Sequence, residues 1–435
     1  MRTVLNKISH SLTSPKFIAE HRANPGDFTR ERILTFERVV LLFLQGAAAS
    51  LKHSADTLLR TLLGDVARIT LNSVSKQAIS KACRKLPYTA LAALHQQVVT
   101  TFYAHAQTPR WMGFRLIAAD GSKLRLPRLK VFANAFGTQT NATDVERPMA
   151  LLLSFYDALT HVTVASELAP SDMGERFLAE RLLGYLGPCD LVLYDRGFPS
   201  FPLFALHQAR AIPVCMRMPK GFNAEVRAFV ASNRPERNIV LTPNAEAKRI
   251  CAFLEVPTDP VTLRLVRVRL KSGEIEVLAT SLMDRTQYPR HLFKDLYHQR
   301  WAVEEGFKSL KHVADLQSFR GKSEAAVFQE VYARLITHTL ASIARFAAGG
   351  LVDERVDARR LRYRVNFTEA YRKVQSRLIQ MLTLPDPMPM IRGTLQLIAK
   401  NLEPIRPGRA YPRQRTPAPS GAARTHGKSG AYGLS

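Results

Sequence analysis

The amino-acid sequence predicts an α/β protein: a mixed β-sheet covered by helices, interrupted by a β-rich insertion and flanked by helical regions. Residues 1–110 have apolar side chains at helical spacing and no strand signals. From Phe114 onward, strand-like apolar runs alternate with helical stretches, which is typical of a sheet with helices packed on its faces. Segment 220–286 contains several strand-like runs in succession, which indicates an insertion.

The amino-terminal region contains a short basic segment, Ser73 to Leu86, that could enter a DNA groove as a recognition helix does. Ser73 is placed to cap the helix, and the side chains of Lys76, Lys81 and Arg84 give it positive charge. A basic face exposed to solvent explains the same residues equally well, so both interpretations stand.

The predicted sheet begins with three strands, at 114–120, 148–155 and 161–167. A helix follows, for which Asp172 and Glu175 have the spacing of a capping box. A buried strand at 190–195, a helix at 204–210 and a strand at 212–216 complete this part. A meander of strands followed by helix-linked crossovers predicts a mixed sheet.

The insertion is expected to contain strands at 238–242, 250–256, 263–270 and 275–280, with a hairpin turn at 271–274. In the third of these strands, Arg267, Arg269 and Lys271 alternate with apolar residues and form one basic face. Such a face is usually exposed to solvent, and contact with a DNA backbone is the alternative.

The rest of the chain is expected to be helical from Leu296 to about 346 and again at 366–383 and 389–401. The expected regions are a helical region at 1–110, the sheet domain at 111–219 and 287–345, the insertion at 220–286, a helical region at 346–403 and a basic tail at 404–435. The tail is rich in Pro, Gly, Ala and Ser without apolar periodicity, so it is predicted to be disordered.

The composition indicates a folded protein whose partner is a polyanion. The chain has 62 Lys and Arg against 36 Asp and Glu, a net charge of +26, and 46% hydrophobic residues. Such a charge gives salt-dependent affinity for phosphates. The cysteines have no zinc-binding spacing, and no signal peptide or membrane-spanning run is evident, so a cytosolic protein without membrane association is expected.

The segment Leu296–Lys311 is expected to form one amphipathic helix. At about 100° per residue, the side chains of Tyr297, Arg300, Glu304 and Lys311 fall within an arc of roughly 60°, beside an apolar stripe. One face is therefore buried while the next lines a polar site. The alternative is that Arg300 and Glu304 are an ordinary solvent-exposed pair four residues apart.

Asp120 and Asp195 are expected at the ends of buried strands, and Glu304 on a helix packed against the same sheet. Carboxylates that repel one another are tolerated together when a divalent cation lies between them, and oxygen ligands favour Mg²⁺ or Mn²⁺. Taken singly, Asp120 with Gly121 could be only a turn, and Asp195 could be only a helix cap.

The spacing of Tyr297, Arg300, Glu304 and Lys311 resembles the Tyr-Arg-Glu-Lys signature of DDE transposases from bacterial insertion sequences. Asp120 in Asp-Gly-Ser and Asp195 in Asp-Arg-Gly-Phe resemble the first and second catalytic aspartates of that family. The resemblance implies a ribonuclease-H-like fold interrupted by a β-rich insertion, and a helical DNA-binding region at 1–110.

The resemblance also implies the chemistry. Asp120, Asp195 and Glu304 would hold Mg²⁺ or Mn²⁺, two ions per active site, for cleavage at terminal inverted repeats and strand transfer into target DNA. Tyr297, Arg300 and Lys311 would bind phosphates, and Trp301 would either stack on a displaced base or pack at the edge of the helix. The weaker candidates for DNA contact are Lys308, Arg196 and Arg320. A homodimer on the DNA ends, in the bacterial cytoplasm at the nucleoid, is implied as well.

Two other functions fit the same residues. A structure-selective nuclease or resolvase on the same fold would cut branched DNA without joining strands. A non-catalytic DNA-binding protein derived from a transposase would need no carboxylates to hold metal, so the intact set of Asp120, Asp195 and Glu304 argues against it.

Overall fold

The computed structural model describes residues 1–30, 32–46, 51–63, 74–140, 146–270, 272–352 and 363–405. The chain forms two compact units. The first comprises Met1–Gln107, Leu124–Ala150 and Ser309–Ser435, and the second comprises Thr108–Lys123 and Leu151–Lys308. No helix in the described part of the chain is both long and apolar enough to cross a lipid bilayer.

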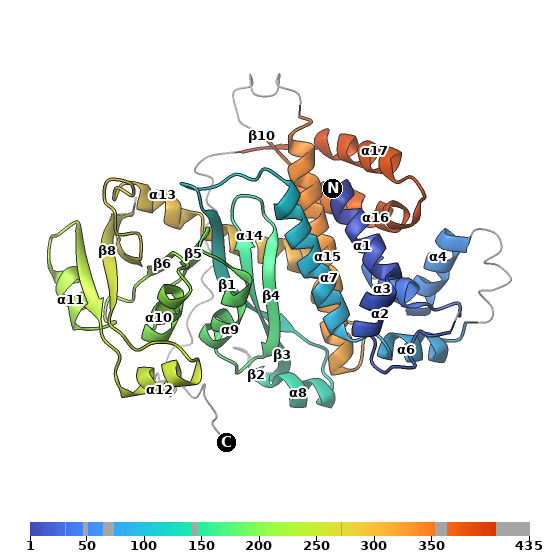
Figure 1. The fold of residues 1–435 in the computed structure, drawn as a ribbon, viewed down its shortest axis with the longest axis horizontal. Helices are drawn as coiled ribbons and strands as arrows, with labels where there is room; N and C mark the ends of the chain where they lie inside the picture. Colours follow the sequence, from blue (N-terminus) through green and yellow to red (C-terminus); the bar gives the residue numbers. More distant parts are fainter. Residues whose placement is uncertain are drawn as a thin grey trace. The chain divides into compact units, whose positions relative to one another are not determined.

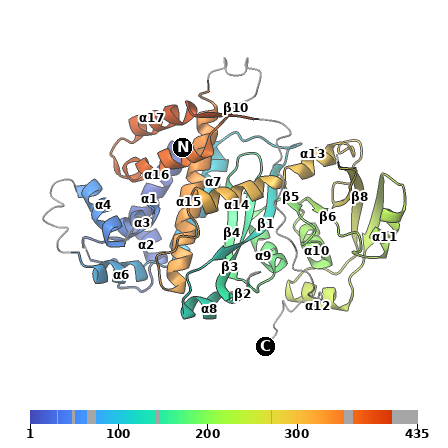
Figure 2. The ribbon, with the colours of Figure 1, turned by 180° about the vertical axis from the view of Figure 1, so that it is seen from behind.

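The first unit is helical and is organised around α15 (Glu324–Gly349), which is buried along much of its length (Figures 1 and 2). Helices α7, α16, α17 and α3 pack against α15. The other helices and their bounds are α1 (Arg2–Thr13), α2 (Pro15–Glu20), α3 (Phe36–Leu44), α4 (Leu51–Leu63), α6 (Lys76–Arg84), α7 (Tyr88–His105), α8 (Lys130–Phe136), α16 (Phe367–Thr383) and α17 (Met388–Ala399). Short strands β10 (Tyr363–Val365) and β11 (Leu402–Pro404) pair antiparallel.

The two units have different bounds from the regions expected from the sequence. Helices α16 and α17 pack on α15, and α16 also packs on α1, so the carboxy-terminal helices share a unit with the amino-terminal ones. Sequence periodicity marks each helix but does not say which distant helix covers its apolar face. The tail expected at 404–435 lies outside the described residues from 406 onward.

The predicted fold class, a ribonuclease-H-like mixed sheet, is confirmed. The strands are ordered β2-β3-β1-β5-β6-β9-β8-β7, and β4 pairs with β3. Strand β1 pairs parallel with β5, and β5 parallel with β6, while β9 runs antiparallel to β6. The bounds are β1 (Arg115–Arg125), β2 (Thr138–Thr140), β3 (Glu146–Asp157), β4 (Thr163–Pro170), β5 (Asp190–Tyr194), β6 (Val214–Arg217), β7 (Glu236–Leu241), β8 (Val261–Arg269) and β9 (Ile275–Thr280).

Helices of the second unit cover both faces of this sheet (Figures 1 and 2). On β5, Leu191 and Leu193 join an apolar cluster with Phe293 of α13 (Leu292–His298). Tyr194 faces the other way, and its hydroxyl lies 3.1 Å from Nε2 of His207 on α10 (Phe201–Ala209). Because side chains alternate along a strand, the odd-numbered residues of β5 face α13 and the even-numbered residues 192 and 194 face α10. The remaining helices are α9 (Glu175–Leu182), α11 (Ala224–Ala231), α12 (Ala245–Phe253) and α14 (Trp301–His312).

The insertion extends the sheet through β7, β8 and β9, close to the bounds expected for three of its four strands. The expected strand at 250–256 is wrong, because these residues lie in and just after α12. Asn244 caps that helix, since its Oδ1 accepts a hydrogen bond from the amide of Ala247 at 2.8 Å. Ala247 and Cys251, four residues apart, are the buried side chains, so the apolar period is helical.

Arg267 on β8 has a structural role. Its guanidinium donates hydrogen bonds to the carbonyl oxygens of Phe229 (2.7 Å) and Arg234 (3.0 Å), at and beyond the end of α11, and also to that of Ser232. Of the predicted basic face, Arg269 is exposed and Lys271 lies outside the described residues.

Candidate active site

Asp120 and Asp195 lie side by side because of the register of β1 against β5. Arg115 pairs with Asp190 at the start of the two strands, and Ala119 pairs with Tyr194 at the end of their ladder. The Arg115 side chain binds the Asp190 carboxylate through two hydrogen bonds, of 2.6 and 2.9 Å, and this geometry fixes the register. Asp120 and Asp195 follow Ala119 and Tyr194 on neighbouring strands, which lie about 4.8 Å apart.

Both aspartates belong to the sheet face that α13 covers. Asp195 continues the side of β5 that carries Leu191 and Leu193, and Asp120 lies on the side of β1 that carries Leu116. Strand β5 ends at Tyr194, one residue before the expected end, whereas β1 continues through Asp120 to Arg125. Asp120 is therefore held within a strand, and its Oδ1 accepts a hydrogen bond from the amide of Gly121 at 3.0 Å.

The single helix expected at 296–311 is wrong, because the helix is interrupted. Helix α13 ends at His298 and α14 begins at Trp301. The amides of Arg300 and Val303 bond to carbonyl oxygens three residues earlier, so the chain tightens into a 3₁₀-like turn here. The four signature side chains therefore do not lie along one straight helix, because two short helices are joined by a turn at Arg300.

Tyr297 is the link between α13 and the second aspartate. Its hydroxyl lies 3.3 Å from both the Asp195 carboxylate and the Tyr194 carbonyl oxygen, with geometry in which it donates to these acceptors. Burial, followed by the negative charge of Asp195, raises the pKa of Tyr297 well above its ordinary value. The side chain therefore stays a neutral donor and holds Asp195 at the end of the sheet.

Arg300 connects the turn to Glu304. Its Nη2 donates to Oε1 of Glu304 at 3.0 Å, and its guanidinium carbon lies 4.9 Å from the ring centre of Trp301. The side chain of Arg300 is only 5% exposed, against 22% for Glu304. Burial lowers the pKa of Arg300, but Tyr297 and the acidic neighbours outweigh it, so the net direction is upward and the charge is retained.

Helix α14 is held close to β3 by a glycine. A Cβ atom added to Gly306 would lie 2.8 and 2.9 Å from ring carbons of Tyr156, which is too close for real atoms. The absence of a side chain at Gly306 therefore sets the distance between α14 and the sheet, and with it the position of Glu304 two residues earlier.

The charges at the site are unbalanced for a buried location. Burial raises the pKa of Asp120 to about 7, and Glu175 and Glu304 act in the same direction, while Arg300 opposes them. Burial also raises the pKa of Glu175, with Asp195 adding to the rise. A positive group placed among these carboxylates would relieve their repulsion.

The sequence did not indicate that Glu175 lies near Asp120, because the spacing of Asp172 and Glu175 predicts a capping box. The structure contradicts this prediction. Gly174 is the N-cap of α9 and makes no side-chain cap hydrogen bond, and Glu175 instead lies against Gly121. No local sequence pattern indicates this contact, since the two residues are joined only by the tertiary fold.

The remaining predicted residues are more dispersed. Arg196 is exposed in the turn after Asp195. Lys308 forms an exposed ion pair with Glu305 at 2.6 Å. Lys311 and Arg320 belong to the first unit, whereas the other predicted site residues belong to the second. Arg320 donates to the hydroxyl of Ser54 at 3.1 Å, so its guanidinium already has a structural partner.

The chemical type of the available donor atoms suits a hard divalent cation. Asp120, Asp195, Glu304 and the nearby Glu175 offer only carboxylate oxygens, the ligands that Mg²⁺ and Mn²⁺ prefer. Within the described ranges, no three His, Cys, Asp or Glu side chains are already arranged as a metal site. Oε1 of Glu304 accepts a hydrogen bond from Arg300, so this oxygen already has a partner.

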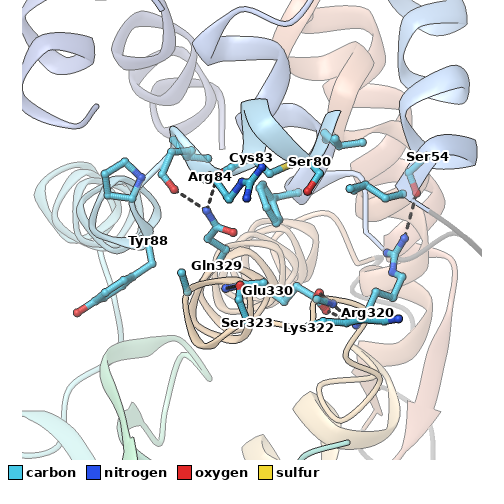
Figure 3. A pocket seen from close by; sticks show the side chains of 18 of the residues that line it. Ser54, Ser80, Cys83, Arg84, Tyr88, Arg320, Lys322, Ser323, Gln329 and Glu330 are labelled. Carbon is cyan, nitrogen blue, oxygen red and sulfur yellow. Dashed lines mark hydrogen bonds between the residues drawn. The ribbon is translucent and has the colours of Figure 1, made fainter. Parts of the chain in front are cut away.

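In the first unit, the predicted recognition helix is α6, capped by Ser75, whose hydroxyl accepts from the amide of Ala78 at 3.2 Å. The cap expected at Ser73 lies outside the described residues. Gln329 of α15 donates to the carbonyl oxygen of Cys83 at 2.9 Å and to that of Leu86, which attaches the carboxy-terminal end of α6 to α15 (Figure 3).

A cavity of about 600 Å³ lies beside this attachment, between α6 and the start of α15 (Figure 3). Its polar lining includes Arg84, Lys322 and the guanidinium of Arg320. Apolar side chains such as Leu42, Phe43 and Leu86 also line it. The exposed side of α6 carries Lys76, Gln77, Ser80, Lys81 and Arg84.

The chain is similar to several known proteins. Residues 111–340 match the family model of the transposase DDE domain. The chain is 24% identical over 270 residues to the transposase InsG for insertion sequence element IS4 of Escherichia coli (strain K12), a match that covers 61% of this chain and 60% of that protein. The cryo-EM structure of the piggyBac transposase synaptic complex with hairpin DNA matches with a TM-score of 0.47 and 10% identity, over 92% of this chain and 86% of that chain.

Members of the matched family are nucleotidyl-transfer enzymes that generally use divalent metal ions. The match to the family model spans more than half of the 435 residues and includes Asp120, Asp195 and Glu304. The chain therefore belongs to the DDE transposase family.

Proposed function

We propose that this protein cleaves DNA at the terminal inverted repeats of an insertion sequence and joins the freed 3′-hydroxyl groups to target DNA. The observation that carries the proposal is the pairing of Ala119 with Tyr194, which places Asp120 and Asp195 side by side. The electrostatic influence of Glu304 and Arg300 on Asp120 supports their inclusion in the same site.

Asp120, Asp195 and Glu304 would hold Mg²⁺ or Mn²⁺, two ions per active site. Such ions, when bound, polarise phosphate oxygens and lower the pKa of an attacking water or hydroxyl group. Tyr297 orients Asp195 through its hydroxyl, and Arg300 orients Glu304 through its guanidinium. These two residues thus act first on the positions of the carboxylates.

One N–H group of Arg300 is available to bind a ligand. Its buried Nε has no hydrogen-bond partner, which is costly for a charged group. We propose that a phosphate of the transposon end accepts from Arg300. Tyr297 and Lys311 would also bind phosphates, and Tyr297 would do so only after its hydroxyl leaves Asp195. Trp301, 44% exposed and stacked on Arg300, would meet a displaced base. Arg196 and Lys308 are exposed and would contact the backbone more weakly.

For the helical amino-terminal region, 1–110, we propose DNA binding through α6. Its exposed lysines and Arg84, with Lys322 on the other side of the cavity, form a basic surface of the kind that binds phosphates. Arg320 would support this surface through Ser54 rather than bind DNA itself. We further propose that the protein acts as a homodimer on the paired DNA ends, at the nucleoid of a bacterial cell.

The test is cleavage of a labelled duplex that carries one terminal repeat, in Mn²⁺, by the wild-type protein and by Asp120→Ala, Asp195→Ala and Glu304→Ala. We expect the wild type to nick at the repeat boundary, and the three variants to bind the duplex without cutting it. Asp259→Ala, at an exposed aspartate, is the matched control and should cut as the wild type does.

Two outcomes would favour the other functions. Cleavage of branched duplexes without any requirement for the repeat, and without strand joining, would identify a structure-selective nuclease. Binding of the repeat by all proteins without cleavage by any of them would identify a DNA-binding protein, and the carboxylates would then have no catalytic role.

A further inference from the structure

Glu175 is an acidic residue near Asp120 that has no role in the proposed function. It is the first residue of α9, where Gly174 is the N-cap and no side-chain cap bond forms. A Cβ atom added to Gly121 would lie 2.7 Å from Cδ and 2.9 Å from Cγ of Glu175. The carboxylate of Glu175 therefore occupies the space that the missing side chain at Gly121 leaves, next to Asp120.

The residue after Glu175 fixes the same turn of α9 to the other aspartate's strand. Nε of Arg176 donates to the carbonyl oxygen of Gly197 at 2.9 Å, two residues after Asp195. The start of α9 is thus attached to the turn that follows Asp195 while it touches the strand that carries Asp120. This double attachment places Glu175 next to both of the segments that carry the aspartates.

Glu175 reaches the aspartates from the opposite face of the sheet. Side chains alternate along β1, so position 121 faces away from the side on which Asp120 and α13 lie. Strand β5 ends at Tyr194, so the ladder between β1 and β5 stops before Gly121, whereas β1 continues to Arg125 beside β3. The absence of a side chain at Gly121 is what allows a carboxylate from α9 to approach.

This position is unfavourable for a glutamate that serves only the fold. Within the described part of the chain, the carboxylate of Glu175 makes no hydrogen bond or ion pair, although the side chain is partly buried. Asp195 and Asp120 are among its electrostatic neighbours, and Lys123 is the cation that acts on it. A carboxylate held near two others without a hydrogen bond costs stability, and such costs are concentrated at functional sites.

We propose that Glu175 is a further metal-binding residue of the active site, whose carboxylate adds to the charge that Asp120 and Asp195 present to a divalent cation. The inference rests on the proposed function, and it explains why position 121 is a glycine. Oxygen donors on two faces of the sheet would then enclose the cation from two sides.

The test measures Mn²⁺ affinity by electron paramagnetic resonance and thermal unfolding in EDTA, on the full chain. The variants are Glu175→Gln, Asp120→Asn and, as the matched control, Glu246→Gln, an exposed glutamate in the first turn of α12. We expect Glu175→Gln to weaken Mn²⁺ binding about tenfold or more. We also expect it to raise the unfolding temperature in EDTA, because repulsion is removed. Glu246→Gln should change neither quantity.

The outcomes separate this inference from the proposed function. If Asp120→Asn weakens Mn²⁺ binding while Glu175→Gln binds as the wild type does, the inference is wrong and the proposed function stands. If Asp120→Asn leaves Mn²⁺ binding unchanged, the proposed metal site itself is wrong. A lower unfolding temperature of Glu175→Gln in EDTA, with or without weaker binding, would mean that Glu175 supports the fold, and would also overturn the inference.

Discussion

The pKa of Asp120 makes a quantitative prediction for the metal-free protein. Burial raises the pKa of this carboxyl from 3.8 to about 7, with Glu175 and Glu304 contributing. Below pH 3.8 the group is protonated in both the folded and the unfolded chain, so it costs no stability. As the pH rises toward 7, the unfolded chain loses the proton first, and the free energy of unfolding falls.

The magnitude follows from the size of the shift. A rise of about three pKa units, at 1.36 kcal/mol per unit, gives a ceiling of about 4 kcal/mol that is lost between pH 3.8 and about 7. For a unit the size of the second one, a change of 1 kcal/mol moves the unfolding temperature by about 2–4 °C. Asp120→Asn removes the titrating group, so its advantage over the wild type should grow with pH and level off above pH 7.

The assay is thermal unfolding in EDTA at intervals between pH 5 and 8, for the wild type, Asp120→Asn and the exposed control Asp259→Asn. Asp259→Asn should follow the wild type at every pH. With Mn²⁺ in place of EDTA, the stability gained from the metal should increase with pH, because a cation favours the ionised carboxylate. A constant difference between Asp120→Asn and the wild type across this range would refute the reasoning.

Three further predictions concern residues that position the site. Gly306→Ala should lower the free energy of unfolding by about 1–3 kcal/mol and slow cleavage, because the new Cβ would press α14 away from Tyr156. Gly187→Ala, where a Cβ meets nothing within 4 Å, is the control and should have neither effect. Equal unfolding temperatures of the two variants would contradict this prediction. Tyr297→Phe should cost about 1 kcal/mol through loss of the hydroxyl that reaches Asp195, and an unchanged thermal midpoint would show that this hydrogen bond is unimportant. Arg267→Ala should lower the free energy of unfolding by about 1.5–3 kcal/mol, because the carbonyl oxygens of Phe229 and Arg234 lose their donor, and it should leave the salt dependence of DNA affinity unchanged. Lys81→Ala should leave the free energy of unfolding unchanged and should reduce the slope of log affinity against log salt concentration by about one.

Much of the sheet could be predicted because its signals are local. The strand at 190–195 and the strands at 263–270 and 275–280 are short apolar runs bounded by turns, and the structure places β5, β8 and β9 within two residues of them. The spacing of Tyr297, Arg300 and Glu304 was also visible in the sequence, and in the structure Arg300 contacts both of the other two residues. The family, confirmed by the match over residues 111–340, follows from the same spacing.

Other features depend on contacts between residues far apart in the chain. The helix break at Arg300 was missed because apolar periodicity continues across it, and the capping box at Asp172 was wrong because α9 starts at Glu175 and turns that residue toward Gly121. The sequence placed Arg267 on a basic face, whereas in the structure its guanidinium binds the carbonyl oxygens of Phe229, near the end of α11, and Arg234, beyond it.

The sequence by itself determined the local structure and the chemical inventory: which segments become strands and helices, and which carboxylates are available for a metal. Only the tertiary structure decided which of these groups lie near one another, because the register of β1 on β5 and the contact of Glu175 with Gly121 join residues more than fifty positions apart in the sequence. Local propensity acts over a few residues, whereas register is fixed by long-range pairing and by the side chains of Arg115 and Asp190.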